Sequence, residues 1–514
     1  MSGLPRPART APVALGDIVA AAGDHADLVA TGDLPREAVV AGAVADNRRV
    51  TGGELFLARP GEQHHAARFA TDAIDRGAAA VLTDHAGRDL LAGAGETRVP
   101  VVVVHDVARA VGAVSALAWG RPAERLRTFA VTGTNGKTTT AYMVDHLLRA
   151  LGRRTGLIGT VQIRIGETAV SSALTTPQAD ELHAVLAAMV EDGVTDVVLE
   201  ASSHALQLGR LDAVTFDVAG FTHLTPDHLD LHGTLEEYFR VKSTLFTPAR
   251  SRAGVVTVDD EWGRRLAADA AASRPGDVWS LGRSDGDVVL TPDGGTGRFG
   301  LSSPVGDVLA STAMPGSFNV SNAALAAAMV LRSGVGADDL TAAAAAGITP
   351  EVPGRMQVLA ESPRVVVDFA HNTEALASIL NELRPTTRGR LWCVTGSAGD
   401  RDRGKRPLMG EVSARLADEV VVTDDDPHGE DPAAIRAQVL AGAVAVEGAS
   451  VVEIGDRREA IAHAILAADA EDTVLLAGRG HETEQEVGDV VHHLDDREEA
   501  LSALERRRVR DDET

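Results

Sequence analysis

The sequence predicts an α/β protein of three domains, in which helices cover mainly parallel sheets. Two observations support this fold class. Short apolar runs of strand length alternate along the chain with segments of helical period, and 514 residues are more than one hydrophobic core usually supports. The runs expected to form strands are Ala79–Thr83, Val99–Val104, Phe129–Thr132, Val197–Glu200, Val365–Phe369, Leu391–Thr395, Glu419–Thr423 and Thr473–Ala477.

Two segments are typical of joints between domains. Residues 106–122 lead from the first group of apolar runs into the next, and residues 348–355 contain two prolines. The expected units are an N-terminal α/β domain (1–105), a central domain with a mainly parallel sheet (106–350) and a C-terminal Rossmann-like α/β domain (351–514).

The composition is that of a folded, soluble protein, with 44% apolar and 24% charged residues. The 49 Lys and Arg against 74 Asp and Glu give a net charge of −25, which opposes binding to a polyphosphate backbone, so we expect no nucleic-acid partner. Asp17 interrupts the apolar stretch near the N-terminus, no run is long enough to span a membrane, and the single cysteine, Cys393, excludes an internal disulfide framework. We expect a cytoplasmic monomer that acts on small molecules.

A strand, a tight glycine turn and a helix follow one another around residue 133. The turn reads Gly133-Thr-Asn-Gly136-Lys137-Thr138, between a buried strand and a segment with helical apolar spacing. Glycines let backbone N–H groups surround phosphate oxygens, the helix N-terminus adds positive potential, Lys137 supplies a charge and the Thr138 hydroxyl can bind Mg²⁺. Val131 stands where the general Walker pattern has glycine, so the loop is a short variant. We predict a nucleoside triphosphate site of P-loop ATPase type.

Two candidate metal-binding side chains follow the phosphate loop along the chain, one at the end of an expected strand and one in a polar turn. One strand ends at Glu200, and His228 lies in a turn rich in polar residues. Ligands of α/β proteins bind at the carboxyl ends of parallel strands, and Mg²⁺ combines few protein ligands with water and phosphate oxygens. We predict Glu200 and His228 as Mg²⁺ ligands. The alternative for Glu200 is a solvated or helix-capping carboxylate, and the role of His204 stays open.

Lys242 lies in an expected helix with apolar side chains at i−4, i−3, i+3 and i+4. Burial disfavours an ammonium, and a neutral amine can react with CO₂ to form an anionic carbamate that binds Mg²⁺. The alternative is a lysine whose stem covers apolar surface while its ammonium reaches water. The residues alone leave both possibilities open.

These motifs and several others occur in a fixed order along nearly the whole chain. They are Gly133-Thr-Asn-Gly-Lys-Thr-Thr139, Leu174-Thr-Thr-Pro177, Glu200-Ala-Ser-Ser-His204, Asp227-His-Leu-Asp230, Lys242, Ser317-Phe-Asn319-Val-Ser-Asn322, Pro353-Gly-Arg355-Met, Asp368-Phe-Ala-His371 and Gly399-Asp-Arg-Asp402. Together they resemble the Mur ligases of bacterial peptidoglycan synthesis, and within them the branch that adds the third, usually diamino, residue. The resemblance implies a UDP-sugar-binding N-terminal domain, a central ATP-binding domain and a C-terminal domain that binds the incoming amino acid.

The implied reaction consumes ATP. The carboxylate of UDP-N-acetylmuramoyl-L-alanyl-D-glutamate attacks the γ-phosphate to give an acyl phosphate, and the amine of a diamino acid then displaces phosphate. The resemblance makes Lys137, Glu200, His228 and Lys242 catalytic, and makes Thr138, Glu200, His228 and carbamylated Lys242 the Mg²⁺ ligands. The residues implied at ATP are Gly133, Thr134, Asn135, Gly136, Lys137, Thr138, Thr139, Asn319, Asn322, Arg355, Asp368 and His371.

The resemblance also implies contacts with the muramoyl peptide. The family usually has serine at position 47 and Asp-Gly at positions 65 and 66, where this chain has Asn47 and His65-Ala66. Asn47 retains a hydrogen-bonding side chain, so we expect the uridine diphosphate site to be retained. The residues implied at the UDP-muramoyl-dipeptide are Asn47, Thr175, Thr176, Ser202, Ser203 and Arg210.

Asp425, Asp426, His428, Gly478 and Glu482 are implied at the incoming amino acid. Residues 425–428 replace the Asp-Asn-Pro-Arg motif of family members that select meso-diaminopimelate, so the arginine that would pair with a second carboxylate is absent. The additional acidic residues favour a cationic ω-amine. We predict L-lysine, with L-ornithine, diaminobutyrate and meso-diaminopimelate as alternatives.

Two rival functions are considered. A folylpolyglutamate synthetase shares the phosphate loop and the acyl-phosphate chemistry, but the Glu-Ala-Ser-Ser-His run and the N-terminal segment point away from it. An inactive ATP-binding scaffold would not need Lys137, Glu200, His228 and Lys242 together.

Overall fold

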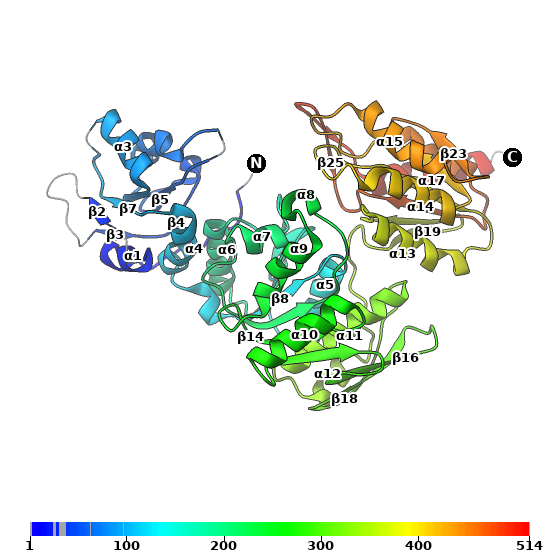
Figure 1. The fold of residues 1–514 in the computed structure, drawn as a ribbon, viewed down its shortest axis with the longest axis horizontal. Coiled ribbons are helices and arrows are strands. Elements are labelled where there is room, and N and C mark those ends of the chain that lie inside the picture. Colours follow the sequence, from blue (N-terminus) through cyan, green and yellow to red (C-terminus); the bar gives the residue numbers. More distant parts are fainter. Residues whose placement is uncertain (1–2, 24–26, 30–37, 62, 96, 513–514) are drawn as a thin grey trace.

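The computed structural model describes residues 3–512 apart from residues 24–26, 30–37, 62 and 96. Three large sheets follow one another along the chain, each packed with helices, and two further sheets have two strands each (Figure 1). The α/β fold class predicted from the sequence is confirmed. Within the described residues, no helix is both long and apolar enough to cross a membrane.

The N-terminal sheet has the strand order β2-β7-β6-β5-β4, and only β2 runs antiparallel to its neighbour. Helix α4 buries Val111 and Val114 in the same core as Leu55 and Leu82, so this helix packs against the N-terminal sheet. The elements are β1 (Val13–Ala14), α1 (Leu15–Ala21), β2 (Asp27–Val29), β3 (Val39–Val40), β4 (Ala43–Val44), β5 (Leu55–Ala58), α2 (Ala70–Asp75), β6 (Ala80–Thr83), α3 (His85–Ala94), β7 (Val101–Val103) and α4 (Val107–Ala118).

The central sheet has the order β11-β10-β9-β12-β8-β13-β14-β15-β16-β17-β18; the strands from β9 to β16 in this order are parallel, and both edges are antiparallel hairpins. Its strands are β8 (Arg127–Thr132), β9 (Thr155–Ile158), β10 (Gln162–Ile165), β11 (Thr168–Ser171), β12 (Asp196–Glu200), β13 (Phe216–Phe221), β14 (Ser251–Thr257), β15 (Val278–Gly282), β16 (Val288–Asp293), β17 (Arg298–Ser303) and β18 (Gly306–Ser311). The helices are α5 (Lys137–Ala150), α6 (Ala179–Glu191), α7 (Ser203–Gln207), α8 (Leu229–His232), α9 (Leu235–Ser243), α10 (Glu261–Ser273), α11 (Ser317–Arg332) and α12 (Ala337–Ala343).

The C-terminal sheet has the order β19-β20-β24-β21-β22-β23, parallel except for β19, and a hairpin of β25 and β26 lies outside it. Its strands are β19 (Gln357–Glu361), β20 (Arg364–Asp368), β21 (Leu391–Thr395), β22 (Glu419–Val422), β23 (Ser450–Glu453), β24 (Thr473–Ala477), β25 (Glu484–Val487) and β26 (Val490–His493). The helices are α13 (Thr373–Leu383), α14 (Lys405–Leu416), α15 (Pro432–Val444), α16 (Arg457–Ala467) and α17 (Asp496–Asp512).

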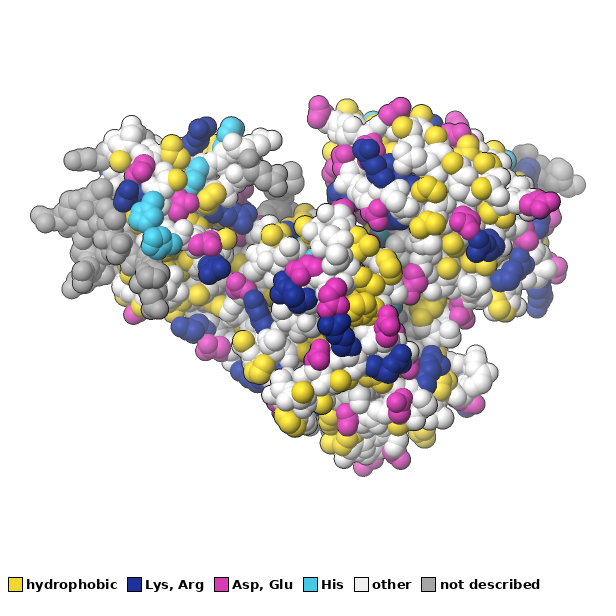
Figure 2. All heavy atoms as spheres, in the orientation of Figure 1, with side chains coloured by type: hydrophobic (Ala, Val, Ile, Leu, Met, Phe, Trp, Pro, Cys, Tyr) yellow, Lys and Arg dark blue, Asp and Glu magenta, His cyan; other side chains and the backbone are white. Residues whose placement is uncertain are grey.

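The strand order brings the predicted functional segments to one edge of the central sheet. β8 lies between β12 and β13, and all three strands are parallel. The phosphate loop after β8 therefore lies between the end of β12, which is Glu200, and the segment that follows β13, which carries His228. On the face shown in Figure 2, the molecule is hollowed between its N-terminal and C-terminal parts, where Figure 1 places α7 and α8.

Candidate active site

The phosphate loop joins β8 to α5 and is held by the segment after β13. The N–H of Thr134 donates to the carbonyl of His223 at 2.8 Å. Lys137 begins α5, and its Nζ donates to the carbonyls of Gly133 at 3.1 Å and Thr134 at 2.8 Å. The Nζ of Lys137 therefore lies against the backbone of the first two residues of the loop.

Gly136 is required by the packing of the loop against α11. Its φ is +85°, and a Cβ at this position would lie 2.6 Å from Asn322 Oδ1. Asn322 Nδ2 donates to Asn319 Oδ1 at 3.1 Å, so the two asparagines form one unit near the start of α11. The structure thus places both residues, which were predicted at ATP, beside the phosphate loop.

Glu200 ends β12, and the residue is only 1% exposed. Its carboxylate accepts hydrogen bonds from Thr138 Oγ1 at 2.8 Å and from the N–H and hydroxyl of Thr160 at 2.8 and 3.0 Å. Two of the predicted Mg²⁺ ligands, Thr138 and Glu200, are therefore in direct contact. A carboxylate and a hydroxyl are both oxygen donors of the kind that Mg²⁺ prefers.

Four of the residues predicted at the muramoyl peptide cluster next to this carboxylate. Thr176 Oγ1 lies 3.3 Å from Ser202 Oγ, and Arg210 Nη1 donates to the carbonyl of Thr176 at 3.1 Å. The hydroxyl of Thr175 accepts a hydrogen bond from Thr160 Oγ1 at 3.0 Å. The structure therefore combines an arginine and several hydroxyls beside the phosphate loop, which suits an anionic substrate.

Ser203 makes a different contact. Its hydroxyl shares a hydrogen bond of 3.0 Å with His232 Nε2, and both residues are buried. The His232 ring in turn lies 5.0 Å from the Tyr238 ring. Ser203 therefore connects α7 to α8 and does not join the other four residues predicted at the peptide.

His228 lies in the segment after β13 with φ +52°, and its ring lies 5.2 Å from the ring of His204. Burial lowers the pKa of His228 to about 3, despite the nearby Asp227. The imidazole is therefore neutral at physiological pH, and a neutral imidazole can bind a metal ion.

Lys242 is buried under the phosphate loop. The residue is 1% exposed, and its Nζ donates to the carbonyl of Gly133 at 2.7 Å and lies 4.5 Å from the centre of the Tyr238 ring. Burial, followed by the charge of Lys137, lowers the pKa of Lys242 well below its ordinary value. The alternative in which the ammonium reaches water is therefore wrong.

The ATP residues predicted on the C-terminal part surround the end of β20. Arg355 Nη2 donates to Thr138 Oγ1 at 3.3 Å, and the guanidinium lies 4.2 Å from the centre of the Phe369 ring. Burial raises the pKa of Asp368 to about 6 and lowers that of His371 to about 4. Arg355 therefore links the segment before β19 to the phosphate loop.

Two residues that the sequence analysis did not single out also bind the phosphate loop. Glu374, in the first turn of α13, accepts hydrogen bonds from Asn135 Nδ2 at 2.9 Å and Thr225 Oγ1 at 2.5 Å. Asn372 caps α13 and donates to Asn135 Oδ1 at 3.2 Å and Asp227 Oδ2 at 3.3 Å. These partners lie 145 to 239 residues apart, so local sequence patterns carry no signal for the contacts.

Lys405 is a third residue that the sequence analysis missed. It begins α14, is partly buried, and its charge acts on Asp227 and His371. The chain has three lysines among 49 Lys and Arg residues, and the other two are Lys137 and Lys242. Because lysine and arginine are not interchangeable at phosphate sites, this rarity of lysine is the signal that could have identified Lys405.

The residues predicted at the amino acid meet at the carboxyl edge of the C-terminal sheet. Carboxylate oxygens of Asp425, Asp426 and Glu482 lie within 4.8 Å of one another. Nη1 of the buried Arg479 lies 3.0 Å from Asp426, 3.7 Å from Asp425 and 3.9 Å from Glu482. A Cβ on Gly478 would lie 2.6 Å from Asp425 Oδ2, so a side chain there would obstruct the cluster. Three carboxylates share one guanidinium, which leaves negative charge for a further cation.

His428 stands beside this acidic cluster with φ +48°. Its Nδ1 lies 3.0 Å from Glu486 Oε2, and its N–H donates to the carbonyl of Glu486 at 2.9 Å. The side chain is therefore held by β25. A second carboxylate on the incoming amino acid would compete with Glu486 for this imidazole.

In the N-terminal part, Asn47, which was predicted at the UDP-muramoyl-dipeptide, and His65, which departs from the family pattern, both contact neighbouring elements of the same domain. Asn47 begins a 3₁₀ turn, Asn47–Arg49, and its Nδ2 donates to Asp72 Oδ2 at 2.7 Å. His65 Nδ1 accepts from the N–H of Ala67 at 3.0 Å and so caps the next 3₁₀ turn. An aspartate would cap this turn in the same way, so the departure at position 65 preserves the local backbone.

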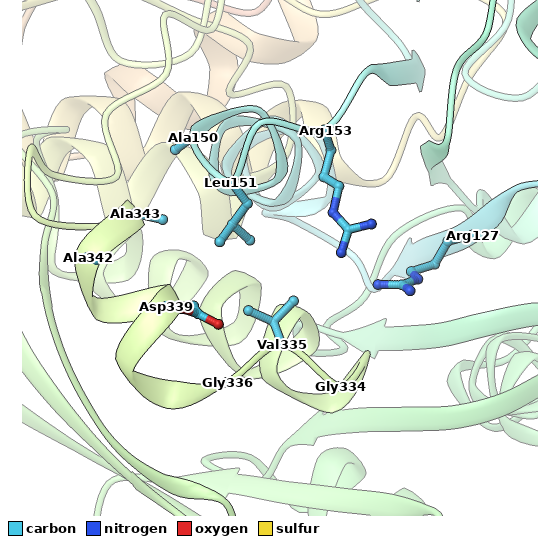
Figure 3. A pocket seen from close by; sticks show the side chains of 10 residues that line it. All are labelled: Arg127, Ala150, Leu151, Arg153, Gly334, Val335, Gly336, Asp339, Ala342 and Ala343. Carbon is cyan, nitrogen blue, oxygen red and sulfur yellow. The ribbon is translucent and has the colours of Figure 1, made fainter.

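A cavity of about 560 Å³ lies at the opposite end of α5, between α5 and α12 (Figure 3). Arg127 begins β8, so the cavity faces the amino edge of the sheet, whereas ligands of parallel sheets bind at the carboxyl edge. No residue predicted for the site lines it. The lining residues are Arg127, Ala150, Leu151, Arg153, Gly334, Val335, Gly336, Asp339, Ala342 and Ala343.

Three segments of the chain match domains of one family. Residues 40–117 match the Mur ligase family catalytic domain, residues 131–330 the Mur ligase middle domain and residues 354–480 the Mur ligase glutamate ligase domain.

Relatives match over most of their length. The chain is 43% identical to a protein of Streptomyces coelicolor named UDP-N-acetylmuramoyl-L-alanyl-D-glutamate–2,6-diaminopimelate ligase, over 98% of this chain and 99% of that protein. It is 43% identical to a UDP-N-acetylmuramyl-tripeptide synthetase of Leifsonia xyli, over 88% of this chain and 89% of that protein. A solved structure of a UDP-N-acetylmuramoyl-L-alanyl-D-glutamate–2,6-diaminopimelate ligase has 31% identity and a TM-score of 0.64, covering 97% of this chain and all of that one. The chain therefore belongs to the Mur ligase family and is an ATP-dependent ligase that forms a peptide bond.

Proposed function

We propose that this ligase adds meso-diaminopimelate to UDP-N-acetylmuramoyl-L-alanyl-D-glutamate, through an acyl phosphate, in cytoplasmic synthesis of peptidoglycan precursors. The observation that carries the proposal is the similarity over 98% of the chain to a protein named for this reaction. The names of the relatives favour diaminopimelate, an alternative of the sequence analysis, over lysine. The geometry supports the reaction class, because the phosphate loop, a hydroxyl and arginine cluster and a cation-accepting acidic cluster occupy neighbouring sheet edges.

The residues of the chain have distinct tasks in this reaction. Lys137 donates to the phosphate oxygens, and Thr176, Ser202 and Arg210 hold the muramoyl peptide with its carboxylate near the γ-phosphate. Arg355 adds a second cation from the C-terminal part. The acidic cluster holds the diamino acid by its distal ammonium, which leaves the α-amine free to attack.

The donor set also fits Mg²⁺. Thr138 and Glu200 are in contact, His228 is neutral, and the buried amine of Lys242 lies beneath the phosphate loop. Addition of CO₂ to that amine, with loss of a proton, would give a carbamate and so a second anionic oxygen ligand. Mg²⁺ held by these groups would neutralise charge on the transferred phosphoryl group.

A second candidate substrate is L-lysine, or the shorter L-ornithine. The observation that favours it is His428, which stands where an arginine would pair with a second carboxylate and which is instead bound to Glu486. The acidic cluster recognises a distal ammonium, which all three diamino acids carry.

The deciding experiment supplies ATP, Mg²⁺ and UDP-N-acetylmuramoyl-L-alanyl-D-glutamate with each diamino acid in turn, and records phosphate release and product mass. Turnover with meso-diaminopimelate supports the first proposal, and turnover only with lysine or ornithine supports the second. No turnover with any amine would instead support the alternative of an inactive ATP-binding scaffold.

The variant His428→Arg is expected to lower the KM for meso-diaminopimelate about tenfold, because a charge-assisted pair with the second carboxylate forms. The same variant leaves the KM for ATP unchanged.

The pH dependence of amino-acid binding provides a further prediction. Burial, followed by the charge of Asp425, raises the pKa of Glu482 to about 8. The distal ammonium binds the ionised carboxylate, so the KM for the diamino acid is expected to fall as the pH rises from 6.5 through 8, while the KM for ATP stays level. The variant Glu482→Gln should have a higher KM that no longer varies over this window. A wild-type KM that rises with pH would contradict this assignment.

A further inference from the structure

A buried ion pair lies next to the acidic cluster, and neither of its two residues was predicted to belong to the site. Arg457 begins α16 and Asp496 begins α17, and both side chains are 0% exposed. Arg457 Nε donates to Asp496 Oδ1 at 2.7 Å, and Nη2 donates to Asp496 Oδ2 at 2.6 Å. This is a two-bond, fork-to-fork pair, the geometry in which an arginine–carboxylate contact is most strongly oriented.

The remaining N–H groups of the same guanidinium bind the two segments that carry the amino-acid residues. Nη2 also donates to the carbonyl of Ala477 at 2.9 Å, and Nη1 donates to the carbonyl of Asp424 at 3.2 Å. Ala477 is the last residue of β24 and directly precedes Gly478, whereas Asp424 directly precedes Asp425. One buried guanidinium therefore bridges the two loops that form the acidic cluster.

The start of α16 is itself tied to the first of these loops. The N–H of Asp424 and the hydroxyl of Thr423 both donate to the carbonyl of Gly455, at 3.2 and 3.1 Å. Asp456 caps α16 by accepting from the N–H of Arg458 at 2.8 Å. Arg457 therefore projects from a backbone that is already fixed relative to residues 423–425.

We propose that Arg457, oriented by Asp496, is a positioning residue for the incoming amino acid. The inference rests on the proposed function, in which Asp425, Gly478 and Glu482 bind that substrate. Arg457 touches no substrate; it fixes the distance between the carboxylates that hold the distal ammonium. Loss of its bonds would let the two loops separate, and residues that orient ligand-binding groups in this way typically change affinity by about 10- to 100-fold.

The test compares two conservative variants with a matched control. Asp496→Asn keeps the shape of the side chain but removes its charge, and Arg457→Lys keeps the charge but cannot reach Asp496 and both carbonyls with one nitrogen. The control is Asp472→Asn. Asp472 is also buried, and it precedes β24 at the opposite edge of the same sheet, where its carboxylate accepts from the N–H of Arg390 and from Trp392 Nε1.

Two readouts separate positioning from general destabilisation. The KM for the diamino acid is expected to rise about 10-fold or more in Asp496→Asn and Arg457→Lys, while the KM for ATP and that for the UDP-muramoyl-dipeptide stay within about twofold. Hydroxylamine attacks the acyl phosphate, releasing phosphate and forming a hydroxamate without using the amino-acid loops. Hydroxamate formation should therefore match the wild type in both variants.

The control should lower the melting temperature without raising the KM for the diamino acid. The proposal is overturned if folded Asp496→Asn keeps a wild-type KM for the diamino acid. It is also overturned if this KM rises but the rate of hydroxamate formation falls as well. Failure of the proposed function looks different, because the wild-type protein would then form no hydroxamate from the UDP-muramoyl-dipeptide and ATP.

Discussion

Replacing Lys137 by alanine is expected to slow acyl-phosphate formation by about a thousandfold, the size of effect that follows loss of one charged group at a transferring phosphoryl group. Lys137 is the first residue of α5, and its Nζ lies over the loop, bound to the carbonyls of Gly133 and Thr134. Alanine retains the helix but removes the only side-chain charge within the loop itself. The expected loss therefore lies in kcat rather than in protein stability.

The measurement is hydroxylamine trapping with ATP and the UDP-muramoyl-dipeptide, which reports the first chemical step alone. Lys137→Arg should recover little, because a planar fork cannot replace a compact ammonium in a loop packed against Asn322. The control is Arg149→Ala, at the exposed end of the same helix, where the side chain pairs with Glu167. A wild-type rate in Lys137→Ala, with Arg149→Ala equally active, would remove Lys137 from the catalytic group.

The sequence predicted some of the parallel strands because they are buried on both faces, whereas β5, β9, β13, β14 and β15 are also parallel and were not predicted. β8, β12, β21 and β24 read as continuous apolar runs, and each lies within two residues of its predicted position. The edge hairpins were missed because exposed and buried residues mix along them. In β18, for example, Leu309 is 71% exposed and Val308 is buried, so the run lacks the continuous apolar signal of a central strand.

The strand, turn and helix around the phosphate loop could be predicted because the residues of the motif are adjacent in the sequence. Gly133 to Thr138 are contiguous, and their chemistry depends on spacing that can be read directly. The contacts of Glu374 with Asn135, and of Arg457 with Asp424 and Ala477, join segments that are far apart in the chain and have no common motif. Such contacts depend on which strand ends are neighbours, and that information comes from the sheet order.

The identity of the amino acid illustrates a different limit. The sequence argument for lysine rested on a missing arginine and on additional acidic residues, yet a substrate carboxylate can pair with any cation that the fold brings near. In the structure His428 is already bound to Glu486, and Arg479 is shared by three carboxylates. The charge that the substrate meets is therefore the net charge of all these side chains together. A comparison of the residues in one loop does not give this net charge, because several of the side chains come from other segments.

Replacing Lys242 by alanine or arginine is expected to lower kcat at least about a hundredfold. The amine is buried, donates to the carbonyl of Gly133 and lies against the Tyr238 ring, so neither its charge nor its length serves a surface role. If the residue acts as a carbamate, arginine cannot replace it, because a guanidinium forms no comparable carbamate. Lys242→Glu, which restores an anion near the same place, is expected to be more active than Lys242→Arg.

The decisive observation for the carbamate is direct. Protein equilibrated with ¹³C-labelled CO₂ should show a carbamate carbon resonance that is absent from Lys242→Arg and retained in Lys405→Arg, where the third lysine is removed instead. Because the chain has three lysines, the resonance can be assigned without a full spectrum. Depleting CO₂ should lower kcat in the wild type and leave Lys242→Glu unchanged. If the resonance is missing while Lys242→Arg is inactive, Lys242 acts through its amine, and the hydrogen bond to Gly133 becomes its main contribution, since it fixes the first residue of the phosphate loop.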